Sequence, residues 1–286
     1  MWLIYLIIGG ILLATQTIIT RKHMTSSKSA LVITFFTIFV GFIFSLFFLM
    51  FNIESWQIVK PFVGIIILSS FVGLFQIYCN NSSYKYLSPS IALTISKIQY
   101  VFIIIGSIFF FSEKFGVHQI IGSMLIIGAS LLILNYTKTP INSKGIFWRI
   151  GSAFFFAVYA FLSKLLVTKI NPFVVYGFSA IGSSVTLLTI MALAGNFKED
   201  IKKTLSNKSN VKYLVSISLL VSVASLMILY GLSQAPVSIT YLIIEAVVIL
   251  AVIGEHFFLS GDRKHFFKKM IAVVLALVGV WLIKTF

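Results

Sequence analysis

Apolar runs long enough to span a membrane follow one another along the whole chain, separated by short polar segments. A helix that crosses the hydrocarbon core of a bilayer needs about 20 mostly apolar residues. Ten runs of this kind are predicted as transmembrane helices, at 2–20, 30–51, 61–79, 87–111, 116–135, 146–167, 172–194, 212–233, 236–259 and 267–284. The pattern predicts an all-α integral membrane protein with no inserted soluble domain.

One sequence pattern occurs twice in the chain. The segment Ser88–Lys114 is matched by Ala235–Lys264, and Pro89 in the first copy stands 147 residues before Pro236 in the second. Two copies of one pattern in corresponding places are the mark of an internal duplication.

The duplication divides the ten predicted helices into two five-helix repeats. We expect the first repeat at 1–136, a linker at 137–145 and the second repeat at 146–286. Because five is odd, the second repeat enters the membrane from the opposite side, so the repeats are inverted. Inverted repeats are common in alternating-access transporters, whose site lies near the midplane between the repeats.

Composition supports a membrane protein and argues against other classes. Hydrophobic residues make up 59% of the chain, charged residues 10%, and the mean hydropathy is +1.06, whereas about a quarter of a soluble domain is charged. The net charge of +15 comes from Lys and Arg in short loops, which is typical of membrane topology and does not indicate nucleic-acid binding. Cys79 is the single cysteine, so no intramolecular disulfide is expected.

The distribution of basic residues predicts an orientation. Sixteen of the 22 Lys and Arg residues lie at loops that follow odd-numbered helices, and five lie on the other side. By the positive-inside rule, the odd loops face the cytoplasm and both termini face out.

Two charges stand out because each lies inside an apolar run. Lys97 in the first repeat falls at the place of Glu245 in the second. A charge at mid-bilayer costs about 2.5 to 3.5 kcal/mol on insertion scales, so it normally faces the bundle interior and has a partner or a function. Two interpretations remain open: the residues bind opposite charges on a substrate, or they form a structural salt bridge between the repeats.

Polar side chains precede each of these charges at helical spacing. They lie about one and two turns before the charge on predicted helices four and nine, which puts them on one helix face. Three further polar residues, on predicted helices one, three and six, are weaker candidates for the same cavity. The candidate substrate-binding residues are Lys97, Glu245, Thr94, Ser90, Tyr241, Ser238, Gln76, Gln16 and Tyr159.

Other polar and small side chains have structural explanations. Charged or titratable residues near helix ends are expected as interfacial caps or ion pairs, namely Glu113, Glu255, His256 and Asp262. Predicted helix ten presents a small-residue face formed by Ala272, Ala276 and Gly279. Such a face suits close helix packing, either within the chain or in a homodimer.

With the repeat in hand, the chain resembles the drug/metabolite transporter superfamily, specifically its ten-helix EamA-type permeases. The resemblance is clearest at the end of the first half, where Pro89 opens an apolar helix that leads to Glu113, followed by Gly122 and Gly128. In the second half Glu245 matches a glutamate often seen in this helix of the family.

Two features depart from the family pattern. Members usually have cytoplasmic termini, opposite to the orientation that the basic residues predict here. The first helix also has Thr15 and Gln16 where small multidrug-resistance relatives carry a proton-coupling carboxylate, so proton-for-cation exchange by that route is not expected.

The resemblance and the charged pair together predict a secondary transporter of the cell membrane, by default the bacterial cytoplasmic membrane. Its expected partners are membrane lipids and a small polar or zwitterionic metabolite, amino-acid-like, bound between the repeats. The alternatives are a lipid or isoprenoid-phosphate flippase and, from another class, a non-transporting scaffold or sensor. The chain has no GxxxxGK[ST] loop for ATP, and its histidines are scattered, so we expect no cofactor, metal site or enzymatic activity.

Overall fold

All of the regular structure in the part of the chain that can be described is helical, as the apolar pattern predicts. The computed structural model describes residues 1–23, 30–50, 56–83, 86–87, 92, 95–133, 142–193, 208–258 and 266–285. The predicted all-α fold is confirmed.

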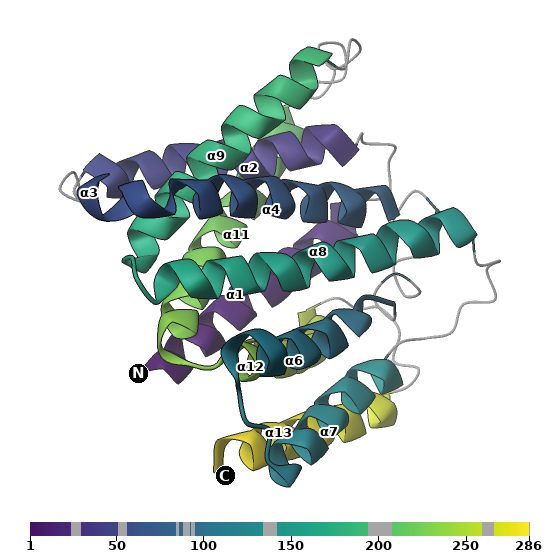
Figure 1. Ribbon diagram of the computed structural model, residues 1–286. Helices are drawn as coiled ribbons and strands as arrows, with labels where there is room; N and C mark the ends of the chain where they lie inside the picture. The colour runs from purple at the N-terminus through teal and green to yellow at the C-terminus, as the bar shows by residue number, and fades with distance from the viewer. Residues whose placement is uncertain are drawn as a thin grey trace.

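The described helices follow the predicted spans closely (Figure 1). In chain order they are α1 (Trp2–His23), α2 (Ala30–Met50), α3 (Trp56–Val59), η2 (Lys60–Phe62), α4 (Val63–Ser83), α6 (Ile98–Phe111), α7 (Val117–Ile133), α8 (Ser143–Val167), α9 (Pro172–Leu193), α11 (Lys208–Gln234), α12 (Val237–Phe258) and α13 (Phe266–Thr285). Most boundaries lie within four residues of the prediction.

Two predicted spans differ from the structure at their N-terminal ends. The third begins earlier, because α3 and the 3₁₀ turn η2 around Pro61 continue directly into α4. The fourth was expected from residue 87; Ala92, Ile95 and Ser96 are helical, the chain turns at Lys97, and α6 begins at Ile98.

The contacts between the two halves are symmetric. The contact of α1 with α11 has its counterpart in that of α8 with α4, and α1 with α12 corresponds to α8 with α6. Likewise α2 packs on α11 as α9 packs on α4. Equivalent helices also pack on each other, α2 on α9, α6 on α12 and α7 on α13, whereas the contacts of α12 with α13 and with α7 have no counterpart of similar size. This is the arrangement expected of two repeats related by a two-fold axis.

Helix α8 connects the two repeats at both of its ends. Near its start, Arg149 Nε donates to the carbonyl oxygen of Ala92 at 2.8 Å, ahead of α6. Near its end, Lys164 Nζ donates to the carbonyl oxygens of Leu232 and Ala235, at the connection into α12. Fifteen residues of helix span about 22 Å, so the connections into α6 and α12 lie at opposite ends of α8, as inverted repeats require.

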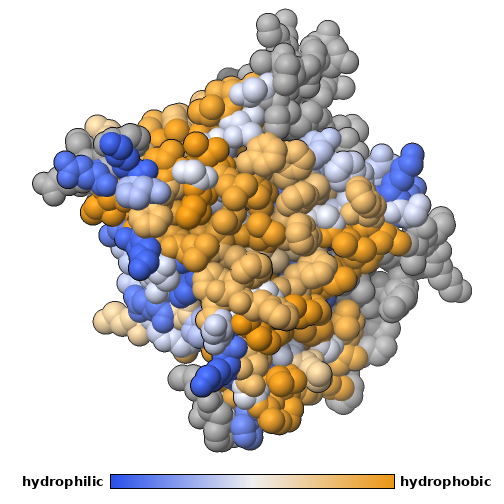
Figure 2. Space-filling model, viewed as in Figure 1, coloured by the Kyte–Doolittle hydropathy of each residue, from blue (hydrophilic) through white to orange (hydrophobic). Residues whose placement is uncertain are grey.

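The outer surface of the bundle is apolar. In Figure 2 hydrophobic residues form a broad continuous area across the middle of the visible face, with hydrophilic residues toward its margins. Four helical segments of the described chain are long and apolar enough to cross a membrane, namely Gln57–Ser83, Ser143–Val167, Pro172–Thr189 and Val211–Gln234, beside six shorter apolar helices. The exact count of ten spans stays a prediction.

The small-residue face of α13 is used inside the molecule. Ala272 and Ala276 are fully buried, and α13 packs along its repeat-equivalent helix α7 (Figure 1). The helices cross where a Cβ atom on either Gly122 or Gly279 would lie 2.7 Å from the carbonyl oxygen of the other glycine. Only glycine permits such a close backbone approach. A homodimer stays an untested prediction.

Candidate functional site

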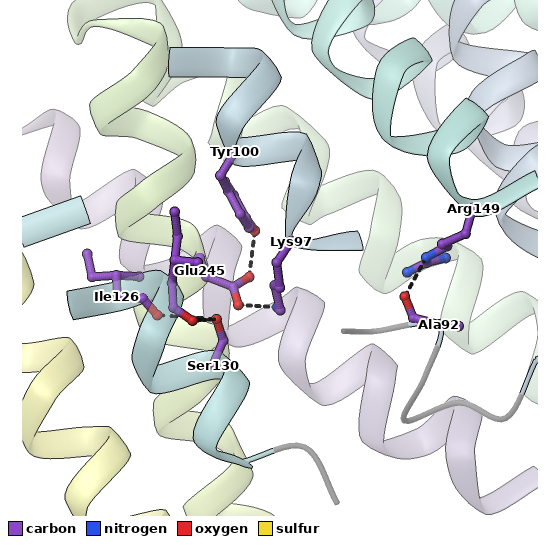
Figure 3. A network of polar contacts seen from close by, with 8 residues as sticks. Ala92, Lys97, Tyr100, Ile126, Ser130, Arg149 and Glu245 are labelled. Carbon is purple, nitrogen blue, oxygen red and sulfur yellow. Dashed lines mark hydrogen bonds and ion pairs between the residues drawn. The ribbon is translucent and has the colours of Figure 1, made fainter. Parts of the chain in front are cut away.

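The two charges singled out in the sequence meet at the contact between α6 and α12. Lys97 Nζ donates to Glu245 Oε1, and Figure 3 shows both side chains pointing toward each other from facing helices. The Lys97 side chain is 13% exposed and that of Glu245 is 6% exposed. The ion pair is therefore largely removed from water and lies where equivalent helices of the two repeats touch.

A tyrosine completes the coordination of the carboxylate. The Tyr100 hydroxyl donates to Glu245 Oε2 at 2.5 Å, so the two carboxylate oxygens of Glu245 have different donors. Tyr100 lies one turn after Lys97 on the same face of α6, and the Lys97 ammonium is 5.9 Å from the centre of its ring. Because a hydrogen bond to an ionised group is stronger than one between neutral groups, Tyr100 helps hold the carboxylate in place.

Aromatic side chains extend the site away from the ion pair. Tyr241, one turn before Glu245 on α12, is buried, and its ring packs edge to face on Phe156 of α8, with 5.1 Å between ring centres. Tyr241 lies near Tyr100 and near Tyr159 of α8. Tyr159 in turn lies near Tyr176 of α9. Tyrosines from four helices thus form a row that begins at Glu245.

The row ends at Tyr176, which lies beside Ser222 of α11 and Gly41 of α2. The Tyr176 and Ser222 hydroxyl groups both lie close to Gly41 of α2, where an added Cβ would be 3.2 Å from the tyrosine oxygen and 3.4 Å from the serine oxygen.

The chain as a whole matches one family model, described as the EamA-like transporter family, over residues 1–135 and again over 143–285. The protein belongs to the EamA-like transporter family. Its membership of a transporter family confirms that it is a multi-pass membrane protein and not an enzyme, and the two matched segments fit a two-repeat architecture.

Individual relatives and structures agree with this assignment. Uncharacterized inner membrane transporter YhbE of Escherichia coli strain K12 is 25% identical over 118 residues, which are 39% of this chain and 37% of that protein. YhbE of Escherichia coli O157:H7 and of Shigella flexneri match equally. A solved crystal structure is similar in fold, with a TM-score of 0.80, 15% identity and coverage of 98% of this chain and 96% of the other.

Four of the other site residues predicted for this EamA-family protein are not seen next to the ion pair in the described part of the chain. Ser90 and Thr94 lie outside the described residues. Gln76, on α4, and Gln16, on α1, are half-buried. The backbone carbonyl of Gln76 accepts a hydrogen bond from Ser152 of α8 at 3.2 Å. This contact joins Gln76 to α8 and does not involve the ion pair.

Ser238 does not join the polar stripe that was expected to lead to Glu245. Its hydroxyl donates to the carboxylate of Glu113, because Ser238 lies in the first turn of α12, about 10 Å along the helix from Glu245. The backbone N–H of Ser238, which has no helical partner in this first turn, donates to the same carboxylate oxygen at 3.4 Å. A role of Ser238 in substrate binding stays a prediction.

Glu113 was expected to be a cap or ion-pair partner because it lies near a helix end, and it caps the N-terminus of α12. It lies two residues after α6 and accepts a hydrogen bond from Val237 N at 2.7 Å. Sequence reasoning missed Tyr100 and Tyr176 as site residues and gave Lys164 no role. For Tyr100 a signal existed, since a residue three positions after a buried lysine shares its helix face.

The described side chains offer no metal centre. Among them no group of three or more His, Cys, Asp or Glu side chains is placed to hold an ion. The chemistry of the site is that of one ion pair, its tyrosine donor and the tyrosine row.

Proposed function

We propose that the protein is a secondary transporter of the bacterial inner membrane that moves a small zwitterionic, amino-acid-like metabolite by alternating access. The observation that carries the proposal is the ion pair between Lys97 and Glu245, buried at the contact between repeat-equivalent helices. The family assignment and the inner membrane location of YhbE support the transport function and the membrane.

Charge balance favours a zwitterion over a singly charged solute. The two charges neutralise each other in the absence of substrate. A zwitterion inserted between them gives its carboxylate to Lys97 and its ammonium to Glu245, so every buried charge keeps a partner. A simple anion or cation leaves one protein charge unpaired, and an unpaired buried charge costs several kcal/mol.

Tyr100 supports this exchange of partners. Its hydroxyl bonds Glu245 Oε2, whereas Lys97 bonds Oε1. When Lys97 turns to a substrate carboxylate, Glu245 keeps one donor and keeps its orientation. The adjacent Tyr241 and Phe156 rings then offer an apolar wall for the rest of the solute.

The position of the pair between the halves suits alternating access. The ion pair joins α6 of the first repeat to α12 of the second, so it holds the repeats together while it is intact. A solute that replaces the direct bond with two bonds of its own separates the helices, and rocking of one repeat against the other then exposes the site to either side.

Ligand-dependent thermal stability of the purified protein tests the proposal. The panel contains amino acids, polyamines and quaternary ammonium compounds, nucleotide sugars and phosphorylated lipids. A ligand at a hundred times its dissociation constant stabilises the folded state by about 2.7 kcal/mol. We expect amino-acid-like compounds to raise the melting temperature of wild type and of the exposed-residue control Lys169→Met, but not of folded Glu245→Gln or Lys97→Met.

Other results would assign a different function. Stabilisation by phosphorylated lipids that is lost in Lys97→Met and kept in Glu245→Gln would indicate a flippase. A protein that binds nothing in the panel and loses only stability when both charges are removed would fit a scaffold or sensor. An amino-acid response that survives both substitutions would place the binding site elsewhere.

A further inference from the structure

The connection between α11 and α12 is a helix break that turns Ala235 and Val237 into the protein and leaves Gln234 and Pro236 exposed. Helix α11 ends at Gln234 and α12 begins at Val237, with Pro236 between them. Ala235 is 2% exposed and Val237 is fully buried. Both helix ends leave backbone groups without helical partners, and those that face inward beside Ala235 and Val237 are bonded by side chains.

Two charged side chains from other helices supply these bonds. Lys164, near the end of α8, donates to the carbonyl oxygen of Leu232 at 2.7 Å and to that of Ala235 at 2.8 Å. Glu113, in the segment after α6, accepts from Val237 N at 2.7 Å and from the Ser238 hydroxyl. The cation meets the carbonyl end of α11 and the anion meets the amide end of α12, the polarity that the helix dipoles favour.

The four groups form a unit that connects three parts of the chain. Lys164 and Glu113 attract each other electrostatically, so the segment after α6, the end of α8 and the break before α12 are held at one place. That place is on the side of the molecule where both termini lie (Figure 1). Ser238 stands seven residues, about 10 Å, before Glu245 on α12, so the unit fixes the end of the helix that carries the site.

We propose that Glu113 and Lys164 are positioning residues that form a latch on α12, and that the latch opens when the site opens toward the face of the termini. The proposal rests on the proposed transport function. With the latch closed, α6, α8 and α12 meet at this face, and Ala235 is shielded from solvent. When it is open, water replaces the side chains at the two helix ends, and the N-terminal turn of α12 moves away from α8.

Chemical labelling of a cysteine in the break tests the latch without any substrate. The reporter is Ala235→Cys in a Cys79→Ser background, treated with a water-soluble maleimide. We expect slow labelling with the native latch and labelling roughly tenfold faster or more in Glu113→Gln and Lys164→Met, because each loses hydrogen bonds to a charged group. Lys114→Gln, which removes the exposed charge next to Glu113, is the matched control and should label slowly.

Two further variants separate a latch on helix ends from a simple ion pair. Lys164→Arg keeps a cationic donor and should label slowly. The exchange Glu113→Lys with Lys164→Glu restores the charge pair but turns a cation toward amides and an anion toward carbonyls, so labelling should stay fast. Slow labelling of a folded exchanged protein would overturn the proposal.

The test remains decisive if a latch variant folds poorly. Ser238→Ala removes one of the partners of Glu113 and should give a smaller increase in labelling in a protein with a native melting temperature. Unchanged labelling in every folded variant would refute the latch and leave the transport proposal untouched. Fast labelling in a protein that binds no panel compound would support the latch and refute the proposed substrate class.

Discussion

A double-mutant cycle on Lys97 and Glu245 measures whether the buried ion pair exists and how strongly it couples the two halves. The side chains are 13% and 6% exposed, so neither charge is well hydrated. Removal of one partner of a buried pair costs about 3 to 5 kcal/mol, because the other charge is left uncompensated. Glu245 keeps its bond from Tyr100 at 2.5 Å, so we expect the lower end of that range, about 3 kcal/mol for each single variant.

The double variant should cost no more than either single one, since Lys97→Met with Glu245→Gln leaves no uncompensated charge. Two single effects of about 3 kcal/mol and a double effect of about 3 kcal/mol give a coupling energy of about 3 kcal/mol. Reversible unfolding in mixed micelles, by titration with a denaturing detergent, measures all four proteins. Single effects that add to within about 0.5 kcal/mol would show that the two side chains do not interact in the folded protein.

Three other substitutions test separate parts of the structure, each by thermal unfolding of the purified protein. Tyr100→Phe should cost about 1.5 to 3 kcal/mol, since a buried carboxylate loses a donor, whereas Tyr86→Phe, at a residue 41% exposed, should change stability by less than about 0.5 kcal/mol. Gly122→Ala should lower the free energy of unfolding by about 1 to 3 kcal/mol, because the added Cβ meets a carbonyl oxygen of α13. Gly128→Ala on the same helix is the control and should not destabilise, since there is open space around Gly128. Equal effects of the two substitutions would refute the close crossing of α7 and α13. Arg149→Met should cost at least about 1 to 3 kcal/mol by leaving a buried carbonyl without its donor, and a neutral effect would contradict the contact.

The helices and the charged pair could be predicted from the sequence because local composition determines both. Spans are set by the length of apolar runs, which the bilayer thickness fixes. Lys97 and Glu245 stood out because a charge inside an apolar run is costly, and the repeat put them in equivalent places. Equivalent helices of a two-fold arrangement often meet at the axis, which is where α6 and α12 touch.

The contacts that could not be predicted join residues far apart in the chain. The bond of Glu113 to Val237 spans 124 residues, and that of Lys164 to Leu232 spans 68. Helical periodicity reports the face on which a side chain lies but not the residue it meets. Ser238 shares a helix with Glu245, and only the packing of the segment after α6 shows that its hydroxyl turns to Glu113.

The ion pair at Glu245 and the latch at the start of α12 differ in what can replace their hydrogen bonds. At Glu245 a side chain bonds a side chain, so a zwitterionic solute offers both charges an equivalent partner and can open the contact without leaving a charge alone. At the latch, Glu113 and Lys164 bond backbone amides and carbonyls, which water satisfies as well as a side chain does. In the proposed mechanism a solute therefore opens the first contact and hydration opens the second. Because α12 carries both, the proposal has the site hold its solute from the face of the termini until water enters at the helix break.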